Sequence, residues 1–179
     1  MKKRTIEEMN RLSVEDFKKS VKTPLVAVLD QVRSAHNTGS VLRTADAFRL
    51  EAVYLCGITP LPPDADLHKT ALGAEDSVCW KHFDDTRDAI AELRGNGYRI
   101  LAVEQCQRST PLQDFAVEPG VPYALVLGHE VMGVDQEVVD LCDGCIEIPQ
   151  VGTKHSLNVS VAGGIVLWEL FKQLNAAAL

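Results

Sequence analysis

The sequence has no run of uncharged residues long enough to cross a membrane. Its longest stretch near the C-terminus without Asp, Glu, Lys or Arg covers residues 155–168, which is too short for a hydrocarbon core of about 30 Å. The first thirteen residues carry charge but no apolar segment, so we expect no secretory signal. The sequence also lacks a P-loop, and no Gly-x-Gly-x-x-Gly segment joins a strand to a helix, which disfavours ordinary dinucleotide binding.

Cysteine is scarce and irregularly spaced. The five cysteines, an odd number, favour reduced thiols in a cytoplasmic protein. Cys142 and Cys145 form a single Cys-x-x-Cys pair, but a zinc site would need two more ligands at a matching spacing. We therefore expect no metal, and free structural thiols rather than a redox centre.

Excess positive charge is also missing, because the 179 residues carry a net charge of −7. This value argues against a strongly basic nucleic-acid binder. The charge is uneven, however. Residues 1–22 hold seven basic and four acidic side chains, a local charge of +3. We expect residues 1–22 to form a basic N-terminal helical arm before a single domain at 23–179. The arm either contacts phosphates or is simply a solvated amphipathic helix.

Apolar runs and helical periodicity alternate along the rest of the chain, and 46% of the residues are apolar. We expect strands at 25–30, 52–58, 98–104, 123–128 and 145–149, and helices at 38–48, 84–94, 135–141 and 157–174. Three prolines between positions 60 and 63 predict a long irregular connection up to about Trp80. The alternation predicts an α/β fold with a mostly parallel sheet, covered by helices on both faces, that binds ligands at the carboxyl ends of its strands.

Three separated segments at those strand ends combine glycines with polar side chains. They are NTGSVLR at 37–43, ALVLGHEVMG at 124–133 and IPQVGTKHSLNVSVAGG at 148–164. Their order and spacing resemble the three motifs of the SpoU (TrmH-like) family of SPOUT-class enzymes, over about residues 25–170. These are knotted (α/β-knot) RNA 2′-O-ribose methyltransferases that use S-adenosylmethionine and release S-adenosylhomocysteine. The resemblance therefore implies a C-terminal deep trefoil knot, although threaded chains are rare.

The resemblance implies a cofactor site built from the second and third segments. Gly128, Ile148 and Leu157 match the family's cofactor-contact positions, at intervals of twenty and nine residues. The loops that follow Leu127 and Ile148 would hold adenine and ribose through main-chain groups. A glycine at 128 lets the backbone approach a flat ligand, because no Cβ intervenes. Core packing is the alternative role for Ile148 and Leu157.

The resemblance also implies a polar active site. The matching positions are Asn37, Arg43, Glu130, Ser156 and Asn158. Glu130 is expected to orient Arg43 or Asn37 by a charge-assisted hydrogen bond. Ser156 and Asn158 are also typical caps for the last helix.

A second set of side chains near this cleft is expected to bind RNA phosphates. These are Arg33, Arg43, Arg49 and Lys154. The leading hypothesis is methylation of a ribose 2′-hydroxyl in tRNA or rRNA. The alternatives are base methylation of RNA on the same scaffold, and a catalytically silent RNA-binding module.

The terminal helix predicts a homodimer. Residues 156–168 contain no charged side chain, and two apolar stripes lie on different sides of the expected helix. One stripe can cover the sheet, so the other needs a partner. Burial by the N-terminal helix of the same chain is the alternative.

Overall fold

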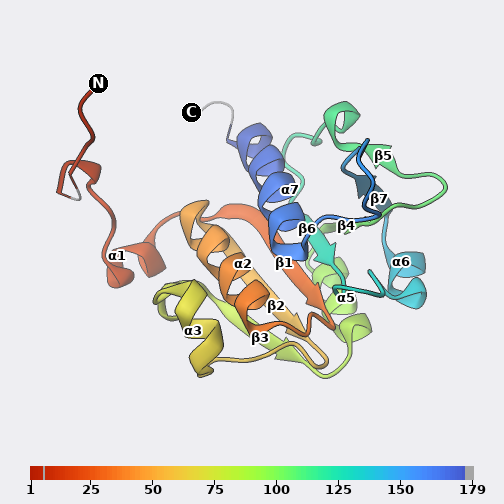
Figure 1. The fold of residues 1–179 in the computed structure, drawn as a ribbon, viewed down its shortest axis with the longest axis horizontal. Coiled ribbons are helices and arrows are strands. Elements are labelled where there is room, and N and C mark those ends of the chain that lie inside the picture. The colour runs from red at the N-terminus through yellow and green to blue at the C-terminus, as the bar shows by residue number, and fades with distance from the viewer. Residues whose placement is uncertain (6, 176–179) are drawn as a thin grey trace.

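Seven parallel strands form one sheet at the centre of the molecule (Figure 1). The structure, a computed structural model, describes residues 1–5 and 7–175. The last four residues of the predicted domain therefore lie outside the described part, as does Ile6 of the predicted arm. The strands are β1 (Thr23–Asp30), β2 (Leu50–Cys56), β3 (Trp80–Phe83), β4 (Arg99–Val103), β5 (Thr110–Pro111), β6 (Tyr123–Leu127) and β7 (Gly144–Glu147), in the order β3-β2-β1-β6-β4-β7-β5. Every strand pair of this sheet is parallel, which confirms the predicted class.

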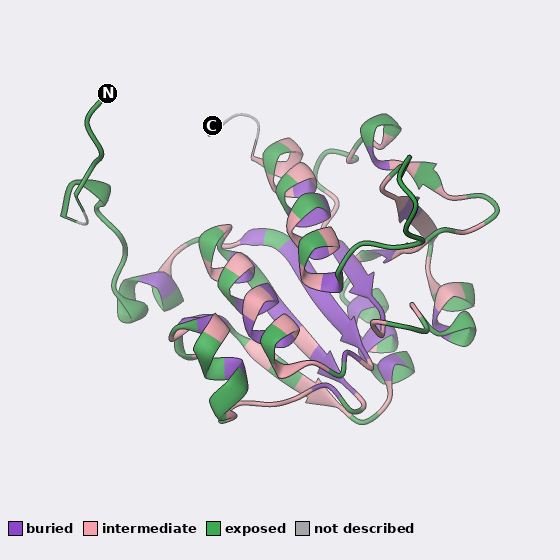
Figure 2. Cartoon of the chain, viewed as in Figure 1, coloured by how far each residue is buried: buried purple, intermediate pink, exposed green. Residues whose placement is uncertain are grey.

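Helices cover both faces of the sheet. One face carries α1 (Val14–Lys19), α2 (Ala35–Ala47), α3 (Ala65–Ala71), α4 (Ala74–Ser77) and α7 (Val159–Leu174), and the other carries α5 (Thr86–Gly95) and α6 (Gln136–Leu141). Two short 3-10 turns lie at Glu7–Met9 and Leu112–Asp114. Strand β1 shows why the strands read as apolar runs. Leu25, Ala27 and Leu29 join the first core cluster, whereas Val26 and Val28 join the second. Figure 2 shows the central strands as the most buried part of the chain.

The connection after the prolines is not the irregular segment that we expected. Asp64 accepts hydrogen bonds from the backbone N–H groups of Asp66 and Leu67, and so caps α3 immediately after the prolines. This helix packs so closely on α2 that a Cβ at Gly39 would lie 2.2 Å from the carbonyl oxygen of Leu67. Strand β3, which the sequence prediction missed, is a short edge strand paired only with β2.

The N-terminal segment forms a shorter helix than its predicted span. Helix α1 begins after Ser13, whose side chain accepts from the Asp16 N–H, and the Phe17 side chain is buried in the core. The division of the chain at residue 22 stays a prediction. No helix in the described part of the chain is long and apolar enough to span a membrane.

Helix α7 returns across the sheet from the far side of β4. Strand β7 pairs with β4, whereas α7 packs on β1, β6 and α2. The intervening segment, 148–158, therefore passes along the carboxyl edge of the sheet. A knot needs such a return, but the knot itself stays an implication of the family resemblance. The helix begins at Val159, two residues later than predicted, because Asn158 is its N-cap.

Candidate active site

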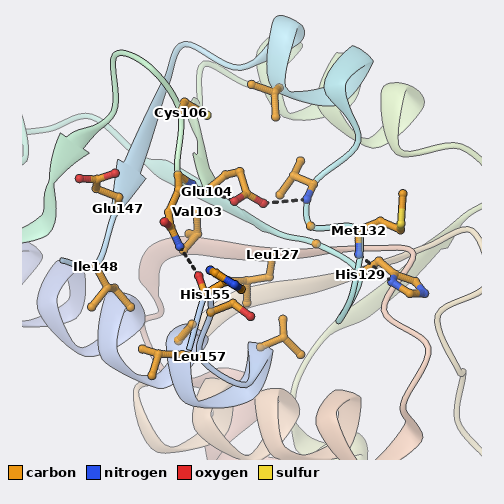
Figure 3. A pocket seen from close by; sticks show the side chains of 18 of the residues that line it. Val103, Glu104, Cys106, Leu127, His129, Met132, Glu147, Ile148, His155 and Leu157 are labelled. Carbon is orange, nitrogen blue, oxygen red and sulfur yellow. Dashed lines mark hydrogen bonds between the residues drawn. The ribbon is translucent and has the colours of Figure 1, made fainter. Parts of the chain in front are cut away.

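A cavity of about 790 Å³ opens at the carboxyl edge of the sheet (Figure 3). Its walls are the loops that follow β4, β6 and β7. All four residues that the sequence assigned to a cofactor line this cavity: Leu127, Gly128, Ile148 and Leu157. The volume lies within the range of about 300–1,000 Å³ that is usual for small-molecule sites.

The three apolar side chains of this set differ in burial. Leu127 is fully buried under α7 and belongs to the core, so packing explains it on its own. Ile148 is half-buried and packs against the core from the cavity wall. Leu157 is 38% exposed while it lines the cavity. Leu157 is thus the side chain most available to a ligand.

Gly128 is required for a reason that we did not expect. A Cβ there would lie 2.1 Å from the carbonyl carbon of Gly133 and 2.2 Å from the backbone nitrogen of Val134. The loop folds back on itself, because the N–H groups of His129 and Gly133 each donate 2.9 Å hydrogen bonds to the other's carbonyl. The glycine therefore allows this loop to close, whether or not a ligand is bound.

The carboxylate of Glu104, the residue directly after β4, holds the same loop. Glu104 Oε2 accepts a 3.1 Å hydrogen bond from the Val134 N–H, and a Cβ at Gly133 would collide with that oxygen (Figure 3). Gln105 Nε2 donates a 2.7 Å hydrogen bond to the carbonyl of His155, which anchors the loop before α7. Sequence reasoning missed both residues. Their only signal was a position at the end of a predicted strand, Glu104 as its last residue and Gln105 directly after it.

Glu130, which lines the cavity, is held at the N-terminus of α2. Its carboxylate accepts hydrogen bonds from the backbone N–H groups of Arg33 (3.0 Å) and Ser34 (2.9 Å) and from Asn37 Nδ2 (2.9 Å). Burial alone would raise the pKa of Glu130, but these hydrogen bonds outweigh it and lower the pKa from 4.5 to about 2. Glu130 is thus ionised at neutral pH. Of the two partners predicted for it, the structure gives Asn37 and not Arg43.

The hydrogen bonds continue from Asn37 to the third segment. Asn37 Oδ1 accepts from Asn158 Nδ2 (3.1 Å) and from Ser160 Oγ (3.3 Å). Asn158 also caps α7, because its Oδ1 accepts from the backbone N–H groups of Ser160 and Val161. One chain of hydrogen bonds therefore joins residues from all three predicted segments. Ser160 was missed, although its place two residues after Asn158 in the first turn of the helix was a usable signal.

Other predicted residues lie apart from this chain. Arg43 is on the solvent-exposed face of α2 and does not line the cavity. Ser156 lines the cavity, is exposed, and makes no hydrogen bond within the described residues. Asn158 therefore performs the capping role that we had offered to both residues.

The predicted phosphate contacts are all exposed, three of them on or next to α2 and one in the segment before α7. Arg33 is exposed, and only its backbone N–H donates a hydrogen bond to Glu130. Arg49 is exposed at the end of α2, with a φ of 48°. Lys154 is exposed in the segment before α7. Within residues 1–5 and 7–175, no group of three or more His, Cys, Asp and Glu side chains is placed to hold a metal ion.

Comparison with known proteins gives matches over most of the chain, including the three segments that build this site. The family model described as "SpoU rRNA Methylase family" matches residues 24–168. The 23S rRNA (guanosine-2′-O-)-methyltransferase RlmB of Nitrosomonas europaea is 35% identical over 162 residues, which are 90% of this chain and 61% of that protein. The tRNA (guanosine(18)-2′-O)-methyltransferase of Escherichia coli K12 is 31% identical over 158 residues, covering 87% of this chain and 66% of that protein.

A solved structure agrees with these matches. The A. aeolicus TrmH/SpoU tRNA modifying enzyme superimposes with a TM-score of 0.79 at 27% identity, over 92% of this chain and 83% of that one. The chain spans about three-fifths of the length of the curated relatives it matches.

Proposed function

Because this chain belongs to the SpoU rRNA methylase family, we propose that it transfers a methyl group from S-adenosylmethionine to a ribose 2′-hydroxyl of tRNA or rRNA. The observation that carries the proposal is the chain of hydrogen bonds from Glu130 through Asn37 to Asn158 beside a cavity of about 790 Å³. This network stabilises the starts of α2 and α7, and it also places an ionised carboxylate and two amides next to the cavity. Related proteins of similar sequence are named as guanosine 2′-O-methyltransferases.

The cavity suits an adenosine-containing ligand. Ile148 and Leu157 offer apolar contacts, and the loops 128–134 and 148–157 offer backbone N–H and carbonyl groups. When bound, S-adenosylmethionine supplies a methyl group on a sulfonium, which is already an activated leaving group. The proposed reaction therefore requires of the protein only alignment and charge stabilisation, and no metal.

The active-site residues divide into two roles. Glu130 fixes the Asn37 amide by accepting from its Nδ2, so Asn37 Oδ1 faces Asn158. This network fixes the N-termini of α2 and α7 relative to each other at the cavity mouth. Ser156, whose hydroxyl makes no hydrogen bond within the described residues, is available to the ligand or the RNA.

Arg43 acts on the RNA in this proposal. Its exposed position on α2 suits a contact with a phosphate and with the developing 2′-oxyanion. A guanidinium hardly deprotonates, because its pKa exceeds about 12. The ribose proton therefore passes to a phosphate oxygen or to water. Further phosphate contacts come from Arg33, Arg49, Lys154 and the basic arm at 1–22. The proposed location of the enzyme is the cytoplasm.

The enzyme acts as a homodimer in this proposal. Val161, Ile165 and Trp168 are 52%, 39% and 46% exposed along one side of α7. Helix α1 does not cover them, so burial by the N-terminal helix does not account for this stripe. A second copy would bury it, and the family resemblance implies pairing through the same region, with partner residues brought toward the active site.

Mass spectrometry of RNA nucleosides tests the chemistry. Cells with and without the gene should differ by one ribose-methylated nucleoside. A substrate with 2′-deoxyribose at the target should accept no methyl, and normal methylation of it would mean that a base is the acceptor.

Calorimetry tests the cofactor site separately. S-adenosylhomocysteine should bind the purified protein without RNA, at one site per chain, and Leu157→Ala should weaken binding by roughly tenfold or more, the effect of burying one leucine side chain. Val151→Ala is the matched control, because Val151 lies in the same segment, does not line the cavity and is 104% exposed. A protein that binds the ligand but methylates no RNA would favour the silent module.

A further inference from the structure

Two thiols meet at the wall of the cavity. Cys106 lies in the loop after β4 and lines the cavity, and its Sγ is 2.9 Å from Sγ of Cys145 on β7. Both are free cysteines. The strand before this loop, β4, pairs with β7, with Ala102 opposite Cys145, so the loop that carries Cys106 begins beside Cys145. A disulfide has an S–S bond of about 2.04 Å, so closure needs a shift of less than about 1 Å.

The side chain of Cys142, the other cysteine of the Cys-x-x-Cys pair, points toward the backbone of α6. Cys142 Sγ donates to the carbonyl of Val138 at 3.2 Å, within the last turn of α6. Burial raises the pKa of Cys142 to about 12, as it does that of Cys145, so geometry distinguishes the two thiols: Cys142 faces the Val138 carbonyl, whereas Cys145 faces Cys106. The Cys-x-x-Cys spacing therefore does not identify the two thiols in contact, because the partner of Cys145 comes from the loop after β4.

We propose that Cys106 and Cys145 form a reversible oxidative modification site, which closes to a disulfide when the protein meets a peroxide. In a reducing compartment, disulfides of this kind are transient and redox-sensing rather than structural. Cys106 is oxidised first, because it lines an open cavity. Burial, followed by the hydrogen bond from Cys106, raises the pKa of Cys145 to about 12, so Cys145 is the second thiol to react.

The chemistry has two balanced steps. The Cys106 thiolate attacks one peroxide oxygen, the O–O bond breaks, and the leaving hydroxide takes up a proton to become water, which leaves a sulfenic acid on Cys106. The sulfur of Cys145 then attacks the sulfur of Cys106. The S–O bond breaks, and hydroxide leaves with the Cys145 proton as a second water. Both thiol hydrogens are lost, and the peroxide is reduced. A small-molecule thiol reverses the reaction by exchange.

Residues next to Cys106 in the chain form hydrogen bonds to the wall of the ligand site. Next to Cys106, Gln105 holds the carbonyl of His155 at 2.7 Å, and Ser109 Oγ donates to Glu147 at 2.7 Å. Figure 3 shows Cys106, Glu147 and His155 around the same pocket. A bond from Cys106 to β7 shifts Gln105 and so loosens the segment before α7. This consequence for cofactor affinity rests on the proposed function, whereas formation of the disulfide does not.

Peptide mapping under non-reducing conditions tests the pair. The full-length reduced protein is treated with hydrogen peroxide, and its remaining thiols are blocked. Trypsin leaves Cys142 and Cys145 in one peptide, but further cleavage before Asp143 separates them. The expected product links the Cys106 peptide to the Cys145 peptide within one chain, with loss of two hydrogens, and it disappears with dithiothreitol. Cys106→Ser and Cys145→Ser should each prevent it, and Cys79→Ser, at an exposed cysteine beside β3, should not.

A link between Cys142 and Cys145, or irreversible oxidation of Cys106 without any link, overturns the proposal. Saturation with S-adenosylhomocysteine should slow the cross-link, and the oxidised protein should bind that ligand roughly threefold to tenfold more weakly, the effect of one net hydrogen bond. Unchanged affinity after complete cross-linking overturns the coupling to the cavity. If the reduced protein fails to bind S-adenosylhomocysteine, the proposed function fails, and the peptide map still decides the thiol pair.

Discussion

The Asn37 side-chain amide donates a 2.9 Å hydrogen bond to Glu130, a residue 93 positions later in the chain. Two backbone N–H groups at the start of α2 complete the carboxylate's environment, and together these donors lower the pKa of Glu130 to about 2. Glu130 is therefore a stabilising ionised group as well as a proposed active-site residue.

This shift predicts a pH-dependent effect of Glu130→Gln. Since the folded pKa is below the unfolded value of 4.5, the carboxylate stabilises the fold fully above pH 4.5 and loses this contribution as the pH falls toward about 2. We expect the variant to lose about 1–2 kcal/mol of unfolding free energy at pH 7, after a discount for partial exposure. Urea titrations at pH 7 and pH 3 should show the difference shrinking in acid. Asp88→Asn, on the exposed surface of α5, is the control. An equal loss at both pH values would contradict the assigned pKa.

Replacing Asn158 or Ser156 by alanine should have different effects on the stability of the protein. Asn158 caps α7 through two backbone N–H groups, so Asn158→Ala should cost about 1 kcal/mol of stability. Ser156 is exposed and makes no hydrogen bond in the described residues, so Ser156→Ala should leave the denaturation midpoint unchanged. Both variants should lower methyl transfer. A stability loss for Ser156→Ala similar to that for Asn158→Ala would mean that Ser156 is the structural cap.

The sheet could be predicted because the strands at its centre are buried on both faces. Such strands give uninterrupted apolar runs, as the fully buried Leu125 and Val126 of β6 illustrate. Helix α3 escaped prediction because only two of its residues, Leu67 and Ala71, are buried, and three prolines precede it. Edge strand β3 is four residues long and half-exposed, so it carries no apolar run.

The candidate site residues came from the family resemblance and stay a prediction, whereas their hydrogen-bond partners could be found only from the fold. Nothing in the sequence indicates that Glu130 meets backbone N–H groups of Arg33 and Ser34 rather than Arg43. Likewise, the reason for Gly128 lies in its own loop, which folds back within 2.1 Å of where a Cβ would be. A Gly128→Val variant therefore tests folding of the loop, and Leu157→Ala is the cleaner test of ligand contact.

Arg43→Ala should impair catalysis without affecting the cavity. Arg43 is exposed on α2 and does not line the cavity, so S-adenosylhomocysteine affinity and thermal stability should match those of the wild type. Methyl transfer should fall by about 10²–10³, the usual effect of removing one charge-stabilising donor. The control is Arg99→Ala, because Arg99 begins β4 at the opposite edge of the sheet and should leave the rate unchanged. Loss of ligand affinity in Arg43→Ala would place this side chain in the cofactor site instead.

Helix α7 should carry the dimer interface, and the structure now identifies which of its residues can test this. Val166 is fully buried, so a charge there would damage the core, although the sequence alone would have allowed it as a test. Gly163 on the same helix packs against Leu127. Ile165 is 39% exposed and lies beside Gly164, where a Cβ would meet nothing within 4 Å. A charge at Ile165 therefore disturbs the exposed stripe without changing the packing of the chain.

Light scattering at micromolar concentration measures the outcome. The wild-type protein should have a mass of about twice 19.6 kDa, and Ile165→Glu should approach 19.6 kDa. The reason is that a carboxylate buried without a partner at an interface costs more than the lost apolar contacts stabilise. Ile58→Glu, at a 61% exposed position in the loop after β2, should remain dimeric. Methyl transfer should fall together with the dimer, because pairing is expected to bring partner residues toward the active site. An Ile165→Glu protein that stays dimeric would place the interface on another surface.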